Sequence, residues 1–293
     1  MTKKLSSESL VAEAESRNCP IWQVVLEQET RLLASDRETV WAKMEQRWQV
    51  MKQALAAGEQ PGNSSLSGLV GDEGVLLSKY LTVQQPLSGV GTIRAAGRAM
   101  GVAVINASLG KIVAAPTAGS CGILPAVLAT AAESLGAVEK AVVAALFTAA
   151  GIGMIIDDNA TTAGAKGGCQ AECGSASCMA AAAAVEIAGG TPRQSVNAGA
   201  IALKNLLGLV CDPVAGLVEI PCVKRNAIGA AVALLSADMA LAGVESRIPL
   251  DEVIGAMREI GDALPSSLKE TSLGGLANTP TARQIEQQLQ HRS

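Results

Sequence analysis

The feature that most restricts the fold of this chain is the small size of its apolar side chains. Hydrophobic residues make up 49% of the 293 residues, whereas aromatic residues make up only 2%. From about residue 86 onward, glycine and alanine fill most of the periodic positions, and β-branched residues are scattered. Because small side chains let helices approach closely, the sequence predicts an all-α fold of tightly packed, buried helices.

Apolar periodicity and capping patterns predict where the helices lie. The candidates are residues 89–102, 121–134, 137–155, 174–188, 195–207, 224–243 and 250–264. Thr279 and Pro280 have the pattern of an N-cap and a first helical residue, which predicts a final short helix. Ser35 followed by Glu38 is a capping-box pattern, and Gly58 ends the helix that this box begins.

A polar loop rich in glycine and serine, residues 60–68, divides the sequence into two parts. The sequence predicts an N-terminal helical arm over residues 1–60 and a main helical domain over residues 61–293. Only 17% of the residues are charged, against roughly 25% in typical soluble domains. This low share favours an extensive interface with another chain.

Charge and hydropathy exclude several classes of protein. The net charge is −4 and there is no basic run, so nucleic-acid binding is excluded. Lys3 and Lys4 are followed by polar residues where a signal peptide would be apolar, and the expected location is the cytoplasm. Residues 141–156 are too short for a membrane span, which needs roughly 18–20 residues, and Asp238 interrupts residues 227–244. Buried core helices, not membrane spans, are therefore expected.

The cysteines are the side chains that suggest chemistry. The chain has seven of them: Cys19, Cys121, Cys169, Cys173, Cys178, Cys211 and Cys222. A cytoplasmic location argues against a disulfide framework. On one helix, Cys169 and Cys173 would share a face, with Cys178 on roughly the same side. Prolines and a glycine between Cys211 and Cys222 predict a loop that can bring both thiolates to one centre.

Two kinds of metal site fit this pattern. Structural zinc prefers four nitrogen or sulfur ligands, but the only histidine, His291, lies near the C-terminus and no pair of CxxC motifs is present. An iron–sulfur cluster also takes thiolates and tolerates widely spaced ones. The spacing alone leaves both zinc and iron–sulfur open.

Four stretches carry a resemblance to a known family. They are residues 114–119 (AAPTAG), 160–172 (ATTAGAKGGCQAE), 208–222 (GLVCDPVAGLVEIPC) and 270–277 (ETSLGGLA). In order and spacing they resemble the alpha region of the iron–sulfur-dependent L-serine dehydratases. The resemblance extends from about residue 20 to 285.

The resemblance implies a cofactor, a substrate and a partner. It implies a [4Fe–4S] cluster held by Cys169, Cys211 and Cys222, with one iron open to L-serine, which would become pyruvate and ammonia. Some single-chain relatives carry an extra N-terminal domain and a cysteine at the very C-terminus. This sequence begins instead with the helical arm, so the resemblance implies a hetero-oligomer with a separate beta chain. The other cysteines are interpreted as small buried residues.

Substrate contacts are expected near two of these stretches. Thr117, Gly119 and Ser120 precede a predicted helix near Cys121, and the free N–H groups of a helix N-terminus suit a carboxylate. Further donors are expected just ahead of the first cysteine ligand, from Asn159, Thr161 and Gly164. Possible general bases are Lys111, Lys166 and Lys224, but none is assigned.

Three other functions stay open on sequence grounds. A cysteine desulfidase on the same scaffold would use the open iron on a thiol leaving group, and assays with serine and cysteine would separate the two. A non-catalytic helical subunit stabilised by zinc would be colourless. A pyridoxal-phosphate dehydratase would need an α/β fold, which the alanine-rich helical pattern disfavours.

Overall fold

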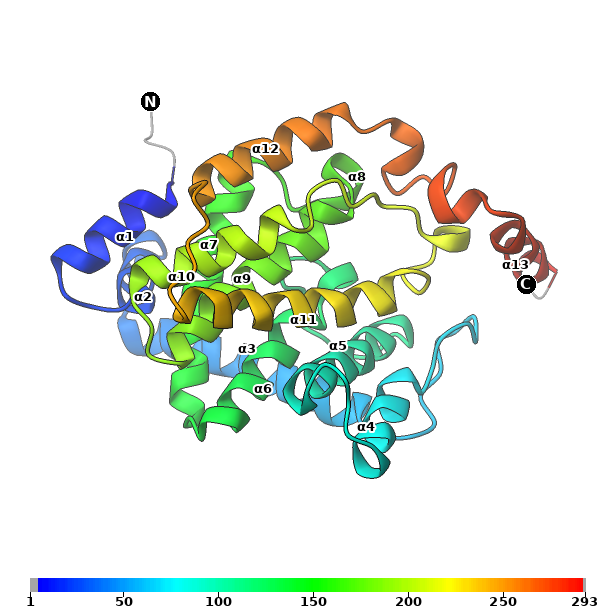
Figure 1. The fold of residues 1–293 in the computed structure, drawn as a ribbon, viewed down its shortest axis with the longest axis horizontal. Coiled ribbons are helices and arrows are strands. Elements are labelled where there is room, and N and C mark those ends of the chain that lie inside the picture. The colour runs from blue at the N-terminus through cyan, green and yellow to red at the C-terminus, as the bar shows by residue number, and fades with distance from the viewer. Residues whose placement is uncertain (1–4, 292–293) are drawn as a thin grey trace.

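The fold is built from helices alone. The computed structural model describes residues 5–291, and within that range the chain forms 13 α-helices and no strand, as predicted. The helices are α1 (Ser7–Ser16), α2 (Ile21–Leu32), α3 (Arg37–Gly58), α4 (Glu73–Val83), α5 (Val90–Ala107), α6 (Ile123–Leu135), α7 (Glu139–Asn159), α8 (Gly164–Gly167), α9 (Ser175–Ile187), α10 (Pro192–Lys204), α11 (Cys222–Leu241), α12 (Leu250–Ala263) and α13 (Pro280–Gln290). Helices α1 and α13 lie at opposite ends of the long axis (Figure 1).

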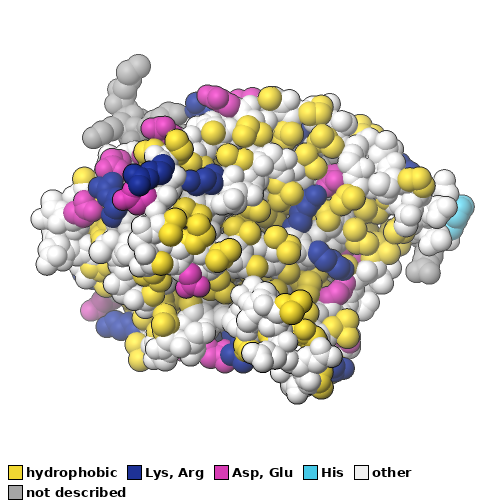
Figure 2. Space-filling model, in the orientation of Figure 1, with side chains coloured by type: hydrophobic (Ala, Val, Ile, Leu, Met, Phe, Trp, Pro, Cys, Tyr) yellow, Lys and Arg dark blue, Asp and Glu magenta, His cyan; other side chains and the backbone are white. Residues whose placement is uncertain are grey.

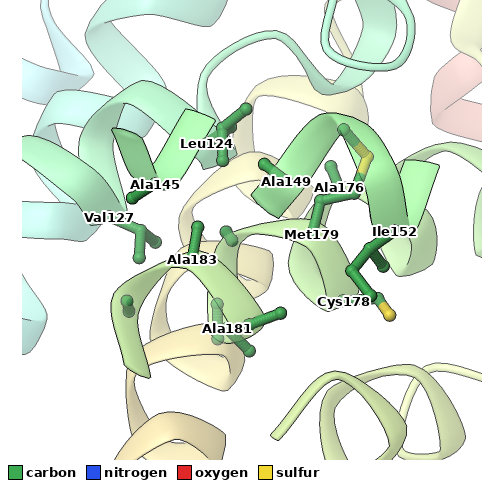
Figure 3. Packing of buried hydrophobic residues seen from close by; sticks show 14 of the residues in the cluster. Leu124, Val127, Ala145, Ala149, Ile152, Ala176, Cys178, Met179, Ala181 and Ala183 are labelled. Carbon is green, nitrogen blue, oxygen red and sulfur yellow. The ribbon is translucent and has the colours of Figure 1, made fainter. Parts of the chain in front are cut away.

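Helix α9 is the centre of the fold. It packs against α6, α7, α10 and α11, and the alanines from Ala180 to Ala183 have no exposed surface. Figure 3 shows Ala181 and Ala183 facing the interior among larger residues such as Val127 and Ile152. Alanine here shortens the distance between neighbouring helices, which is how a core with few aromatic residues becomes dense.

Glycine allows an even closer approach between α3 and α5. A Cβ atom on Gly58 would lie 2.5 Å from the carbonyl carbon of Gly101, and a Cβ on Gly101 would lie 2.7 Å from the carbonyl oxygen of Gly58. Neither helix backbone can yield at that distance. The prediction of closely approaching helices is thus confirmed at a contact that only two glycines permit.

The N-terminal helices contribute to the same core as the rest of the chain. Buried residues of α1, α2 and α3 belong to one hydrophobic cluster with residues of α5, α6, α7 and α9 to α12. Trp41 of α3 stacks on Phe147 of α7, with ring centroids 5.7 Å apart. A division at residue 60 remains a prediction, and the polar loop there does not separate two cores.

Two capping predictions have different outcomes. Thr279 is the N-cap of α13, and its side chain accepts a hydrogen bond from the N–H of Ala282. The predicted cap at Ser35 is wrong, because Asp36 caps α3 and accepts from the N–H of Thr39. A carboxylate at the N-cap also interacts favourably with the helix dipole.

Two segments have the length and hydropathy of membrane spans. They are residues 118–135, of which 67% are buried within the fold, and α7, in which 72% of the most apolar 18-residue window is buried. Core helices of globular folds meet the same criteria, so these segments are weak indicators of a membrane. The packing of α7 against α2 and α9 agrees with the interpretation as buried core helices.

Candidate functional site

Three separate segments bring cysteines to one end of α9. Cys169 lies directly before a single π-helical turn, Gln170–Gly174, which continues into α9. Cys222 is the first residue of α11, and Cys211 lies in the loop before it. All seven cysteines are free thiols. Cys169, Cys211 and Cys222 lie close enough to affect one another's pKa.

Cys173 is part of this group, although the sequence suggested only a core residue. The Sγ atoms of Cys169 and Cys173 lie 3.4 Å apart, which confirms that they share a helical face. The hydrogen bond between them lowers the pKa of Cys169 and raises that of Cys173. Cys178 is fully buried and lies against Gly199 of α10, so it is the core residue that was expected.

The loop that carries Cys211 is held by the segment that follows α12. The N–H of Cys211 donates to the carbonyl of Leu268 over 2.9 Å, and its carbonyl accepts from the N–H of Glu270 over 2.8 Å. A further hydrogen bond runs from the Oγ of Ser272 to the carbonyl of Pro213 over 2.6 Å. The chain's closing motif is thus a structural support for a cysteine nearly sixty positions earlier.

Burial determines the protonation of two of the thiols. Burial raises the pKa of Cys222 to about 12 and also raises the pKa of Cys211. Both are therefore protonated at neutral pH unless a cation replaces the proton, as happens when thiolates ligate a metal.

Glu172 lies between the cysteines and the 114–119 segment. Its Oε1 accepts a hydrogen bond from the Oγ1 of Thr117 over 2.7 Å, and its Oε2 lies 3.9 Å from the Sγ of Cys211. Burial raises the pKa of Glu172, and the charge of Glu270 acts in the same direction. A buried carboxyl group with a raised pKa beside nucleophilic side chains is a frequent property of catalytic sites.

Two glycines leave room around this carboxylate. A Cβ atom on Gly164 would lie 2.5 Å from the Oε2 of Glu172 and 3.3 Å from the Sγ of Cys211. A Cβ on Gly119 would lie 3.0 Å from the Oε1 of Glu172. Any larger residue at Gly164 would displace the carboxylate or the thiol.

The predicted substrate contacts fall into two groups. Thr117, Gly119, Ser120 and Gly164 lie around Glu172, and the Oγ atoms of Thr117 and Ser120 are 3.3 Å apart. Asn159 makes its hydrogen bonds outside this group, because its side-chain amide donates to the carbonyls of Leu5 and Ile155. Thr161 caps its own turn by accepting from the N–H of Ala163. The structure thus unites four of the six residues.

Asn226 explains how the 117–120 loop is held. Its side chain has no exposed surface. It accepts from the N–H of Gly122 over 3.0 Å and donates to the carbonyl of Gly119 over 2.8 Å and to that of Cys222 over 3.0 Å. One of the N–H groups expected to be free for a substrate carboxylate is therefore already in use, and the loop is tied to the first turn of α11.

A buried ion pair adds charge to the same region. The Nη1 of Arg225 lies 2.9 Å from the Oδ1 of Asp212, with the side chains 16% and 3% exposed. The same Nη1 donates to the carbonyl of Val210 over 2.8 Å. The Arg225 charge lowers the pKa of both Cys169 and Cys222, against the larger opposing effect of burial.

The cysteines do not form a site for a single ion. Within residues 5–291, no three His, Cys, Asp or Glu side chains converge closely enough to hold one metal ion. A cavity of about 420 Å³ lies between α3, α7 and residues 113–116, but no cysteine lines it. The cysteines of the group come from separate segments, and iron–sulfur clusters tolerate widely spaced thiolates.

Sequence reasoning missed four side chains that the site contains. They are Glu172, Asp212, Arg225 and Asn226. Each lies three or four positions from a predicted cysteine ligand or directly beside one. Glu172 and Asp212 also lie within the motifs at residues 160–172 and 208–222, so the polar residues of these motifs were the available signal.

Comparisons with known proteins agree with one another. A family model described as "Serine dehydratase alpha chain" matches residues 16–277. The "Probable L-serine dehydratase, alpha chain" of Bacillus subtilis is 47% identical over 282 residues, which is 96% of this chain and 94% of that protein. The "L-serine dehydratase, alpha chain" of Peptoniphilus asaccharolyticus is 41% identical over 280 residues, 96% of each chain. A Latilactobacillus sakei protein with the first of these two names is 60% identical over 63% of this chain.

Proposed function

The chain belongs to the serine dehydratase alpha chain family, and from this premise we propose that it is an L-serine ammonia-lyase. The reaction removes the α-proton and the hydroxyl group of L-serine as water. The resulting aminoacrylate takes up water and gives pyruvate and ammonia. The observation that carries the proposal is the convergence of three cysteine-bearing segments and the Thr117 loop around Glu172.

The proposed cofactor is a [4Fe–4S] cluster on Cys169, Cys211 and Cys222. The donor set fits it, because the three thiols come from three segments, Cys169 raises the pKa of the other two, and Arg225 lowers the pKa of Cys169 and Cys222. When bound, the cluster supplies a Lewis acid for the leaving hydroxyl group.

The chain's own residues bind the substrate and take its proton. Glu172 is the proposed acceptor of the α-proton, because its carboxylate lies against Gly164 and beside Cys211. Thr117 holds this carboxylate through its 2.7 Å hydrogen bond. Gly119 and Gly164 let the carboxylate lie this close to the backbone, since a Cβ at either position would contact it.

A second chain completes the proposed enzyme. The relatives are named alpha chains, which implies a beta chain. The surface agrees with a partner: Ile228 and Leu235 on α11 are 60% and 62% exposed, and Figure 2 shows hydrophobic side chains across the middle of the face where Figure 1 draws α11. The cytoplasmic location expected from the sequence remains a prediction.

The test is anaerobic purification with and without a co-expressed beta chain, followed by iron and sulfide analysis and by assays of pyruvate from L-serine and L-cysteine. Replacing Cys169, Cys211 or Cys222 by serine is expected to remove both iron and activity. The matched control is Cys178→Ala, which changes a buried thiol outside the group. Zinc in place of iron, activity that survives all three replacements, or a preference for L-cysteine would contradict the proposal.

The alternative functions are not favoured. The relatives' names refer to serine and not to cysteine, and the absence of strands within residues 5–291 removes the α/β fold that a pyridoxal-phosphate enzyme would need.

A further inference from the structure

We infer that Arg225, together with Asp212, is a positioning residue that sets both the retention and the reduction potential of the cluster. This inference rests on the proposed function. It concerns a pair of side chains that contact neither L-serine nor the reacting atoms, and that act through the thiolates of the cysteine ligands.

The pair joins all the segments on which the Cys211 loop depends. Asp212 follows Cys211 directly, and Arg225 lies in the first turn of the helix that Cys222 begins. Besides its contact with Arg225, Asp212 accepts through Oδ2 from the N–H of Leu276 over 2.7 Å. The ion pair therefore links the loop before α11, α11 itself and the closing segment at one point.

A stabilising role alone does not explain a buried ion pair at this place. Removing two charges from water costs about as much free energy as their attraction returns, so well-packed apolar residues are often as stable or more so. Here the side chains of Asp212 and Arg225 are 3% and 16% exposed. The ion pair lies beside the cysteine group, and from this position we infer that its charges act on the thiols.

The direction of the effect follows from the arrangement of charges. Three thiolates bring negative charge into a buried site, which is unfavourable unless a cation lies near. Arg225 is the cation at this place, since its Nη1 lies 2.9 Å from the Oδ1 of Asp212 and 2.8 Å from the carbonyl oxygen of Val210, the two residues that flank Cys211. A positive charge beside a cluster also favours its reduced form, and the potential of a cluster follows the net charge around it.

The experiment measures iron retention and midpoint potential in the protein reconstituted with iron and sulfide. The variants are Arg225→Gln, which removes the charge; Arg225→Lys, which keeps it; and Asp212→Asn, which removes the opposing charge. Arg98→Gln is the matched control, because Arg98 is 18% exposed and paired with Glu59 and Glu133 but lies outside the cysteine group.

Opposite shifts are expected from the two halves of the pair. Arg225→Gln lowers the midpoint potential and weakens iron retention by ~10–100-fold, the usual effect of losing a residue behind a metal ligand. Asp212→Asn raises the potential, and Arg225→Lys restores it toward that of the unchanged protein. Arg98→Gln lowers thermal stability and leaves the potential unchanged.

Several outcomes would overturn the inference. If Arg225→Gln and Asp212→Asn leave the potential unchanged or shift it in the same direction, the pair is only structural. If Arg225→Gln does not fold, the upward shift in Asp212→Asn still decides the question. An unchanged protein that binds no iron in the presence of its beta chain would instead overturn the proposed function, and this inference with it.

Discussion

A partly buried glutamate lies at each end of α9, and the comparison separates a site from a structural contact. Glu172 precedes α9 and accepts from Thr117, whereas Glu186 lies near its end and accepts from Thr148. Burial raises both pKa values, that of Glu186 to about 7. By burial, partner and pKa, the two carboxyl groups are nearly alike.

Their surroundings differ. Around Glu172 lie Gly119, Gly164 and Cys211, and an added Cβ at either glycine would contact the carboxylate. Glu186 instead accepts from the backbone N–H of Trp22, in the first turn of a helix whose N-cap, Pro20, makes no side-chain hydrogen bond. Glu186 thus serves as a remote cap for α2. A shifted pKa shows that the surroundings favour one protonation state of a carboxyl group. Only the neighbouring groups show whether that carboxyl group can take part in a reaction.

The largest expected difference between the two ends is in turnover. Glu172→Gln should lower kcat by at least ~100-fold, the lower end of what a positioned acid or base contributes, because glutamine accepts no proton. Glu186→Gln should change kcat by less than about twofold, because a substitution away from the site acts on stability and not on the activation free energy of the reaction. Anaerobic pyruvate formation measures both, with iron content as the control. Equal losses in the two variants would break the comparison.

The second largest difference is expected from substitution of Gly164, which lies beside Glu172. Gly164→Ala places a Cβ 2.5 Å from the Glu172 Oε2, and displacing a catalytic group by about 1 Å costs up to ~100-fold in rate. We expect a loss of about 10–100-fold in kcat with a folded protein. The matched control is Gly255→Ala in α12, where nothing lies within 4 Å of the new Cβ; alanine there should stabilise the helix by about 0.5–1 kcal/mol. Full activity in Gly164→Ala would show that the carboxylate is free to move.

A third difference appears in the pH dependence of stability. Burial raises the pKa of Glu186 from 4.5 to about 7, so folding takes up a proton between these pH values and the fold weakens as pH rises through that range. Glu186→Gln should remove this loss and raise the free energy of unfolding at about pH 8 by up to ~3 kcal/mol. Little change is expected at a pH below 4.5.

Thermal unfolding at several pH values checks this prediction. Glu259→Gln, on the exposed side of α12, is the control, and it should keep the pH dependence of the unchanged protein because Glu186 is still present. A stabilisation by Glu186→Gln that is the same at all pH values would mean that the carboxyl group has the same pKa in the folded and the unfolded protein.

The smallest effect concerns the two threonines. Thr148→Val removes a buried hydrogen bond to Glu186 and should lower the free energy of unfolding by about 1–2 kcal/mol without changing kcat. Thr117→Val should do the reverse: lower kcat about tenfold, the equivalent of one hydrogen bond to a charged group, with little change in stability. Paired measurements of unfolding and turnover decide this, and a stability loss in both variants would remove the distinction.

The sequence was sufficient for the helices because their periodicity is local. The expected segments 137–155, 174–188 and 224–243 correspond to α7, α9 and α11, and Cys169 and Cys173 share a face as predicted. The π-helical turn at Gln170–Gly174 was not predictable, because one extra residue in a turn leaves no signal in side-chain spacing. Contacts across the fold were equally hidden: nothing in the spacing of Asn226 indicates that it holds Gly119 and Gly122.

The support of Cys211 by Leu268 and Glu270 has a consequence for how the protein is made. Leu268 and Glu270 are synthesised 57 and 59 residues after Cys211. A nascent chain of intermediate length therefore carries Cys211 without the two backbone hydrogen bonds that hold its loop. We expect the proposed cluster to be inserted only after residues 268–270 have joined the fold.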